Sequence, residues 1–529
     1  MSRTCVVLAL GMALAEAALP GRGWADSGSR PNIVYVLCDD LGYGDVGCNN
    51  ERGKVPTPNV DRLAAAGMRF TDAHSGSSVC TPTRYGILTG RYSWRSRLQS
   101  GVLDGFSPPL IAKDRLTVAG LLKQHGYATA CIGKWHLGME WPVADSAPAA
   151  KGKREKANRG GTQIDFAQPI EGGPTARGFD YCFGISASLD MPPYTFIEND
   201  RVAAMPTAQA AKEEFGRPGP KAPDFRACDV LPALTAKAVQ YVEQHAGAGK
   251  PFFLYLPLNA PHTPIAPSAA FAGKSALGRY GDFVMEVDWS LGQVLDALER
   301  KGVADSTLVI FTSDNGCSPA AGTAALESQG HFSSGPFRGY KADIWDGGHR
   351  VPFIARWPGK VKAGAVCDDT IGLIDLMATC ADLLQVKLPD NAGEDSVSFL
   401  ADLLGTAKTP LREALVHHSI NGSFAIRKGR WKLELCPGSG GWSGPKPGSA
   451  AEQKLPAVQL YDMSSDPSER RNLCDQQPQI VQQLTGLLEK YVADGRSTPG
   501  TAQRNDVPVN LWKSKRLSAG GAGKPVTRD

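Results

Sequence analysis

The stretch that decides the fold is Pro31-Asn32-Ile33-Val34-Tyr35-Val36-Leu37-Cys38-Asp39-Asp40. Its apolar run is short and continuous, which is typical of a strand buried on both faces of a parallel sheet. Two aspartates follow at its carboxyl end. Because α/β sheets gather their functional residues at the carboxyl ends of strands, Asp39 and Asp40 are the first candidate site residues.

Helical segments and apolar strands alternate over the next part of the chain. Helices are predicted over residues 58–67, 117–125, 231–244, 283–301 and 371–384, and strands over 127–132, 251–256, 307–312 and 351–356. This alternation favours an α/β fold with a large, mostly parallel sheet flanked by helices.

After about residue 400 the pattern changes to short strands separated by glycine-rich turns. Strands are predicted at 414–418, 424–426, 431–435 and 459–462, and a helix over 478–491. We therefore expect a main domain over residues 26–400 and a smaller C-terminal α+β subdomain over 401–529, with an antiparallel sheet and a helix. Residues 147–161 and 437–454 are poor in apolar side chains and are predicted to be surface insertions.

Composition excludes several classes of function. The chain has 529 residues, 42% apolar and 21% charged, which is ordinary for a globular protein of this size. A formal net charge of +4 is too small to indicate a nucleic-acid-binding protein or a polybasic membrane binder. Beyond residue 30, no apolar run approaches the ~18 residues that a membrane span needs, so stable membrane insertion is not expected.

Residues 1–25 are typical of a secretory signal peptide. Arg3 supplies a positive charge, residues 4–19 are apolar, and small residues near Ala18 and Ala25 offer cleavage sites. An uncleaved N-terminal anchor is the alternative. We therefore expect an exported protein, periplasmic or secreted.

The twelve cysteines permit disulfides in an exported protein, but their spacing does not determine which of them pair. No two cysteines have C-x-x-C spacing. A structural zinc site is therefore not expected.

A second acidic pair follows another predicted strand. Asp314 and Asn315 come after strand 307–312. With Asp39 and Asp40 they offer an all-oxygen ligand set, which suits Ca²⁺ or Mg²⁺ better than zinc or copper. Either pair alone would be equally consistent with turn or helix-cap residues.

Lysine and histidine side chains also follow predicted strands. Lys134 and His136 follow strand 127–132, and His262 lies on a proline-rich loop after strand 251–256. Lys341 lies further along the chain. Lysine is a compact cation for an anionic oxygen, and histidine moves protons near neutral pH. Taken singly, each of these residues would more often be solvated surface.

The most specific motif is residues 78–91, SVCTPTRYGILTGR, which contains Cys80, Pro82 and Arg84. A buried, inert cysteine is the ordinary alternative. With the residues named above, this motif resembles the type I, formylglycine-dependent sulfatases of the arylsulfatase and N-acetylgalactosamine-6-sulfatase kind, within the alkaline phosphatase superfamily. The resemblance spans roughly residues 31–400. One departure is Thr83, where the family usually has serine; the hydroxyl is kept.

The resemblance implies an alkaline-phosphatase-like fold and a modified nucleophile. A formylglycine-generating enzyme would oxidise Cys80 to formylglycine (3-oxoalanine), and one hydroxyl of the hydrated aldehyde would attack sulfur. The ion, Ca²⁺ rather than Mg²⁺, would be bound by Asp39, Asp40, Asp314, Asn315 and residue 80.

The resemblance also implies roles for the other catalytic residues. Arg84 would hold the second hydroxyl of residue 80, and Lys134 and Lys341 would neutralise sulfate oxygens. His262 would protonate the leaving alcohol. His136 would remove the proton that lets sulfate leave and the aldehyde re-form.

The expected function is hydrolysis of sulfate monoesters. The substrate would be an aryl sulfate or a sulfated carbohydrate attacked by exo action, with N-acetylgalactosamine 6-sulfate as one example; loops 100–109 and 186–194 would line the pocket next to the sulfate. Two alternatives stay open: a phosphomonoester or phosphonate-ester hydrolase of the same superfamily, and an exported protein that binds sulfated glycans without catalysis.

Overall fold

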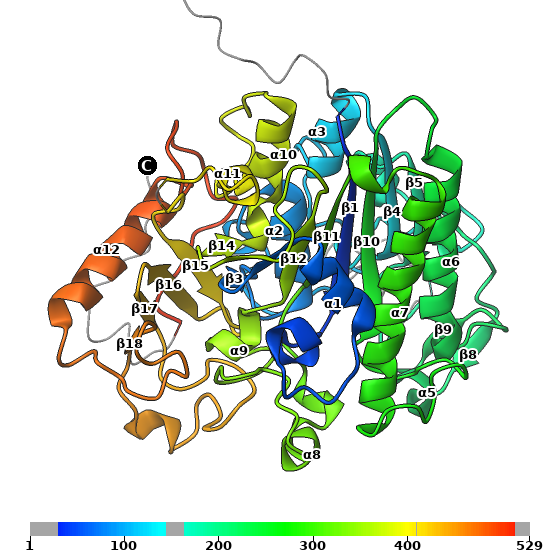
Figure 1. Cartoon of the computed structure of the whole chain (residues 1–529). Coiled ribbons are helices and arrows are strands. Elements are labelled where there is room, and N and C mark those ends of the chain that lie inside the picture. Colours follow the sequence, from blue (N-terminus) through cyan, green and yellow to red (C-terminus); the bar gives the residue numbers. More distant parts are fainter. Residues whose placement is uncertain (1–29, 144–162, 409, 514–529) are drawn as a thin grey trace, which may run out of the picture. The chain divides into compact units, whose positions relative to one another are not determined.

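A ten-stranded sheet forms the centre of the computed structural model, which describes residues 30–143, 163–408 and 410–513. The strand order is β13-β2-β12-β11-β1-β10-β4-β5-β6-β7. Figure 1 labels the strands from β12 to β5 in this order. The five central strands run parallel to one another: β11 (Thr307–Ser313), β1 (Asn32–Asp39), β10 (Phe252–Pro261), β4 (Ala128–Lys134) and β5 (Tyr181–Ile185). The predicted mostly parallel sheet is confirmed.

Some outer strands of the sheet are antiparallel to their neighbours. At one edge, β12 is antiparallel to both β11 and β2, and at the other edge β6 and β7 form a hairpin. Their bounds are β2 (Met68–Phe70), β12 (Phe353–Arg356), β13 (Ala365–Cys367), β6 (Ile197–Glu198) and β7 (Arg201–Val202).

Helices cover both faces of the sheet because its central strands are apolar on both faces. Every side chain of β1 from Ile33 to Cys38 is fully buried. Side chains such as Tyr35 pack with α2 (Cys80–Thr89), α3 (Val118–Gln124) and α10 (Leu376–Leu384). Side chains such as Val36 pack with α1 (Pro58–Ala65), α6 (Ala227–His245) and α7 (Gly278–Arg300).

The C-terminal part forms the predicted antiparallel sheet, with strand order β15-β16-β17-β18. It comprises β15 (Leu415–His418), β16 (Phe424–Lys428), β17 (Trp431–Glu434) and β18 (Gln459–Asp462), and α12 (Pro478–Ala493) packs against it. The boundary near residue 400 stays a prediction. Shorter elements are β3 (Ala73–His74), β14 (Ile371–Gly372), β8 (Ala208–Ala210), β9 (Gly219–Lys221), α5 (Lys212–Phe215), α8 (Thr323–Ser328), α9 (Asp346–His349) and α11 (Leu400–Leu403).

The predicted helix over 371–384 begins too early. Residues 371–372 form β14, which pairs with β3, and a 3-10 turn follows over Leu373–Asp375. Only at Leu376 does α10 begin. The apolar pattern is continuous through this stretch, so the sequence does not reveal that the backbone of its first residues pairs with another strand.

The predicted surface insertion over 437–454 is partly wrong. Its first residues are buried, and the backbone N–H of Ile344 donates to the carbonyl of Ser439 (2.8 Å). The carboxylate of Asp343 accepts from the N–H groups of Trp442 and Ser443. Glycines allow this segment to approach closely: a Cβ at Gly441 would lie 2.2 Å from the carbonyl oxygen of Ala342. The predicted insertion 147–161 and signal peptide 1–25 lie outside the described residues.

The eleven cysteines among the described residues are all free thiols. Within the same residues, no helix combines the length and the apolarity that a membrane span requires.

A buried arginine after α2 forms an ion pair within the predicted main domain and a hydrogen bond to the C-terminal part. Arg95 donates to Asp395 through Nε and Nη2 (both 2.8 Å) and to the carbonyl of Tyr491 in α12 (3.0 Å). Both members of the pair are fully buried. Burial alone would raise the pKa of Asp395, but Arg95 holds it below its ordinary value.

We predict that Arg95→Ala lowers the free energy of unfolding by about 3–5 kcal/mol, because it leaves the Asp395 carboxylate buried without its partner. Urea denaturation followed by tryptophan fluorescence measures the change. The control is Arg62→Ala, which removes an exposed pair with Asp296 and should cost about 1 kcal/mol or less. Equal losses for the two variants would contradict the prediction.

Candidate active site

The carboxyl ends of β1 and β11 bring four predicted site residues together. The two strands are parallel and paired from Asn32–Thr307 to Cys38–Ser313, so Asp39-Asp40 and Asp314-Asn315 follow the last pair side by side. The N–H of Asp40 donates to Asp314 Oδ1 (3.3 Å), and Asn315 Nδ2 donates to Asp40 Oδ1 (2.8 Å). All four side chains are buried.

Two buried lysines neutralise the first acidic pair. Lys134, the last residue of β4, places Nζ 2.6 Å from Asp39 Oδ2. Lys341 Nζ lies 2.7 Å from Asp40 Oδ1. Burial by itself would raise the pKa of Asp39, but Lys134 and other nearby cations hold it well below its ordinary value. Burial by itself would lower the pKa of Lys341, but Asp40 and the other acidic groups around it together outweigh burial and raise the pKa.

The third cation, Arg84, lies on α2 one turn after Cys80. Its Nε and Nη2 both donate to Asp314 Oδ2 (3.0 and 2.7 Å), and Nη1 donates to the carbonyl of Lys134 (3.0 Å). Burial raises the pKa of Asp314, and Arg84 opposes that rise. Arg84 therefore fixes the position of the Asp314 carboxylate, just after β11, relative to α2.

Cys80 is the first residue of α2 and is 2% exposed. Its sulfur and one carboxylate oxygen each of Asp39 and Asp314 lie within 4.8 Å of one another. Burial raises the pKa of the thiol, although Lys134 and Lys341 oppose the rise. At neutral pH the thiol is therefore protonated and a weak nucleophile.

The hydroxyl of Thr83 holds the turn into α2. It donates to the carbonyl oxygens of Ser77 (3.0 Å) and Val79 (3.1 Å). A serine hydroxyl could make the same bonds, so the departure at this position keeps the local structure of the motif.

The two predicted histidines differ in their surroundings. His136 is fully buried; Nε2 lies 2.7 Å from the carbonyl of Leu103, and Nδ1 has no partner among the described residues. Burial and then Lys134 lower the pKa of His136 well below its ordinary value. His262 is 7% exposed; Nδ1 lies 2.6 Å from the carbonyl of Thr263, and Nε2 lies 3.7 Å from Asp40 Oδ2.

The donor set at this edge fits a hard cation. Asp39 Oδ1 and Asn315 Oδ1 are buried and accept no hydrogen bond in the described structure. A buried carboxylate or amide oxygen without a donor is costly, and a bound ion removes that cost. These oxygens, with those of Asp40 and Asp314, match the all-oxygen coordination that Ca²⁺ prefers.

Sequence reasoning did not name Asn259, and it included Ser186 and Ser188 only as part of loop 186–194. Asn259, near the end of β10, is fully buried, and both of its amide atoms lack partners among the described residues. Ser186 Oγ and Ser188 Oγ, just after β5, are also buried and have no partner there. Their position at the ends of parallel strands is the signal that could have found them.

Comparison with known proteins places the chain in a family. The Sulfatase family model matches residues 31–386, more than half of the chain. The chain is 35% identical to an N-acetylgalactosamine-6-O-sulfatase of Bacteroides thetaiotaomicron, over 87% of this chain and 93% of that protein. It is 32% identical to human arylsulfatase A, over 89% of this chain and 90% of that protein.

A solved structure from Bacteroides thetaiotaomicron, described in a study of the metabolism of multiple glycosaminoglycans, superposes with a TM-score of 0.75. Its sequence is 34% identical, and the match covers 88% of this chain and 99% of that chain. With the matched family model and curated relatives over nearly the whole chain, this protein belongs to the sulfatase family and is a sulfuric ester hydrolase.

Proposed function

We propose that the protein is an exo-acting carbohydrate sulfatase, with N-acetylgalactosamine 6-sulfate as the first substrate to test. The observation that carries the proposal is the convergence of Cys80 with buried carboxylates and cations at one edge of the sheet. The name of the relative at 35% identity supports a sulfated amino sugar as substrate. The composition of residues 1–25 supports export to the periplasm or the medium.

The charges of the site suit a sulfate ester once a divalent ion is present. The carboxylates of Asp39, Asp40 and Asp314 are balanced by Lys134, Lys341 and Arg84. The proposed Ca²⁺, held by oxygens of the two acidic pairs, would add positive charge that polarises a sulfate oxygen and lowers the pKa of a hydroxyl on residue 80. The excess positive charge then favours binding of an anion.

We propose that Cys80 is converted to formylglycine by a formylglycine-generating enzyme. Support comes from the protonated, weakly nucleophilic state of the buried thiol and from its position at the N-terminus of α2, where the helix favours an anion. The hydrated aldehyde would carry two hydroxyls. One attacks sulfur, and the second lets the ester to residue 80 break by elimination. Arg84 lies one turn away to hold the second hydroxyl.

The two histidines would divide the proton transfers. In the imidazolium form, His262 donates Nδ1–H to the carbonyl of Thr263 and would transfer the Nε2 proton to the departing sugar oxygen, which leaves the ring neutral. His136 donates Nε2–H to the carbonyl of Leu103, so Nδ1 carries a lone pair. That lone pair can take the proton of the second hydroxyl as sulfate leaves and the aldehyde re-forms. Lys134 and Lys341 neutralise sulfate oxygens as charge builds up.

We predict that Cys80→Ala abolishes turnover of sulfate esters, because no other residue of the site supplies two hydroxyls on one carbon. Co-expression with a formylglycine-generating enzyme should raise activity, and intact-mass analysis should show the thiol replaced by an aldehyde. Cys380→Ala, which removes a buried thiol from α10, is the control and should stay active. Ordinary turnover by Cys80→Ala would refute the proposal.

We expect removal of Ca²⁺ with a chelator to abolish activity, and added Ca²⁺ to restore it better than Mg²⁺. Ca²⁺ accepts several protein oxygens in a flexible geometry, whereas Mg²⁺ needs a near-ideal octahedron and usually keeps several waters. Asp314→Asn should lower Ca²⁺ affinity by at least the roughly 10–100-fold that loss of an outer-shell partner alone causes. Isothermal titration calorimetry measures the affinity. Asp296→Asn, on the exposed surface of α7, is the control. Unchanged Ca²⁺ affinity in Asp314→Asn would show that the ion binds elsewhere.

We predict that His262→Ala cripples turnover of a sulfated sugar by about 10²–10⁴-fold, because a sugar alcohol leaves poorly without a proton. An activated aryl sulfate should be spared much of this loss, since nitrophenolate leaves well unprotonated. Lys134→Ala should impair both substrates, because they share the sulfate charge. Steady-state kinetics on the two substrates, with an aryl phosphate beside them, measures the contrast. If His262→Ala lowers turnover of the sulfated sugar and of the aryl sulfate equally, His262 contributes only to sulfate binding.

A further inference from the structure

Three fully buried histidines from distant parts of the chain meet outside the proposed catalytic set. His74 is in β3, His349 ends α9 and His417 is in β15. One ring nitrogen of each lies within 4.8 Å of the other two. The rings of His349 and His417 stack with centroids 4.0 Å apart. None of the three has a role in the sulfatase reaction proposed above.

Each of these histidines has its outer ring nitrogen held by an acceptor. The pairs are His74 Nε2 with Asp72 Oδ1 (2.9 Å), His349 Nε2 with the carbonyl of Ile344 (3.0 Å) and His417 Nδ1 with the carbonyl of Ser75 (3.1 Å). With a proton on each outer nitrogen, each inner nitrogen carries a lone pair in the plane of its ring. The rings of His349 and His417 are nearly parallel (11°), so one of them must turn before both lone pairs face one ion. Metal-bound histidines likewise have an outer nitrogen held by a carboxylate or backbone carbonyl.

The inner nitrogens lack a full set of protein partners. His74 Nδ1 and His349 Nδ1 are 3.0 Å apart, and His417 Nε2 is buried with no hydrogen bond in the described structure. A hydrogen bond between His74 Nδ1 and His349 Nδ1 would satisfy these two nitrogens if Lys432 Nζ donates to His349 Nε2 (3.2 Å). It would still leave His417 Nε2 without a partner among the described residues. An unpaired buried acceptor costs about 1–3 kcal/mol. A cation at the centre satisfies all three.

We propose that His74 Nδ1, His349 Nδ1 and His417 Nε2 bind one divalent transition-metal ion, best matched by Zn²⁺. Imidazole nitrogens suit Zn²⁺ and its neighbours, whereas Ca²⁺ takes oxygen ligands, so this site is distinct in chemistry from the proposed calcium site. Burial lowers the pKa of all three histidines, which keeps them neutral and able to bind metal at neutral pH.

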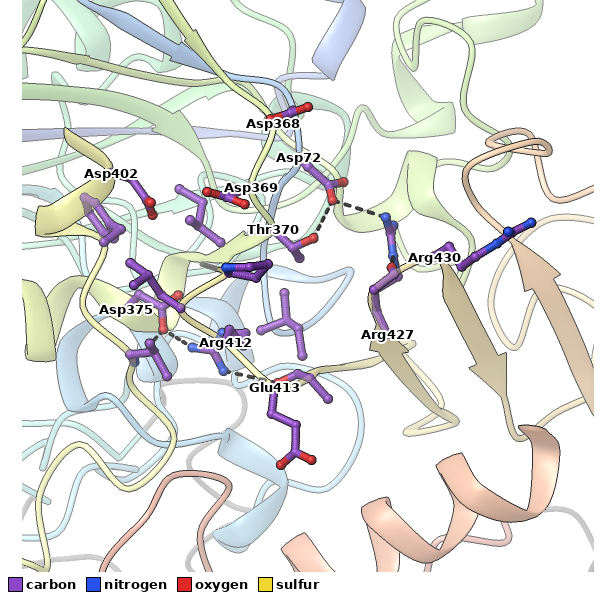
Figure 2. A pocket seen from close by; sticks show the side chains of 18 of the residues that line it. Asp72, Asp368, Asp369, Thr370, Asp375, Asp402, Arg412, Glu413, Arg427 and Arg430 are labelled. Carbon is purple, nitrogen blue, oxygen red and sulfur yellow. Dashed lines mark hydrogen bonds and ion pairs between the residues drawn. The ribbon is translucent and has the colours of Figure 1, made fainter. Parts of the chain in front are cut away.

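Asp72 connects the cluster to the pocket in Figure 2. Asp72 lines this pocket, where it accepts hydrogen bonds from Thr370 and Arg427, and its other oxygen bonds to His74 (Figure 2). The histidines therefore lie one hydrogen bond beyond the pocket wall. Charged groups of both signs line the pocket: the carboxylates of Asp368, Asp369, Asp375 and Asp402, and the guanidinium groups of Arg412, Arg427 and Arg430.

The ion would join three segments that support the active site. His74 lies six residues before Cys80 along the chain, and His349 lies eight residues after Lys341. His417 belongs to the C-terminal sheet. A bound ion would therefore fix the two active-site segments against that sheet, so its main effect should be on stability.

The test is metal content and thermal stability of the purified full-length protein. After equilibration with Zn²⁺ and Ca²⁺ and removal of free metal, elemental analysis should find one zinc per chain, and Zn²⁺ but not Mg²⁺ should raise the melting temperature. His417→Gln should lower Zn²⁺ affinity by at least about 10–100-fold. The matched control is His418→Gln: this neighbouring buried histidine bonds to Ser93 and Ser419 outside the cluster, and its variant should retain zinc.

Because a buried substitution can also unfold the protein, Co²⁺ binding to the unmutated protein is the second measurement. One equivalent of Co²⁺ should give visible absorption bands of a nitrogen-ligated ion, and one equivalent of Zn²⁺ should remove them. Failure of the unmutated protein to retain zinc, with no change in melting temperature and no cobalt bands, would overturn the proposal. Equal loss of zinc in folded His417→Gln and His418→Gln would also overturn it.

Discussion

Three buried carboxylates held against three buried cations at the carboxyl edge of one sheet are the constraint on which this structure depends. Asp39, Asp40 and Asp314 are out of water, where an unpaired charge would be very costly. Each is paired by a cation from another element: α2, the end of β4 or the loop after α8. The position of each charge is therefore fixed by the parallel sheet and by the start of α2, and the site is formed as the sheet folds.

The C-terminal sheet supports the segment that follows Lys341. Lys432 on β17 is fully buried and donates to Asp346 Oδ1 (2.9 Å), Glu469 Oε1 (2.5 Å) and the carbonyl of Ile344 (3.0 Å). Burial lowers the pKa of Lys432, but these carboxylates outweigh it, so the lysine stays charged. Because residues 439–443 also bond to Asp343 and Ile344, the small sheet is part of the framework that positions Lys341.

Much of the fold and of the site could be predicted from the sequence because both depend on local patterns. The apolar run of β1 and the acidic pair after it lie next to each other in the chain, and the alternation of strands and helices predicts parallel pairing. Features that depend on distant contacts were missed. The pairing of residues 371–372 with β3, the burial of the first residues after 436 and the contact of Arg84 with Asp314 have no local signal.

The histidine cluster is another feature that depends on contacts between residues far apart in the sequence. Cysteine spacing gives no reason to expect a transition-metal site, and His74, His349 and His417 are too far apart in the sequence to form a motif. Only the fold brings β3, α9 and β15 together. Sequence reasoning named the candidate site residues that lie at strand ends, and it could not find residues that are brought together only by the fold.

The most direct test of the central claim is a crystal structure of the formylglycine-containing protein grown with Ca²⁺. The account predicts one ion at the edge of β1 and β11, with oxygens of Asp39, Asp40, Asp314 and Asn315 about 2.3–2.6 Å from it. Lys134 and Lys341 should contact a bound sulfate. An ion bound elsewhere, or no ion at this edge with Ca²⁺ present, would contradict this expectation.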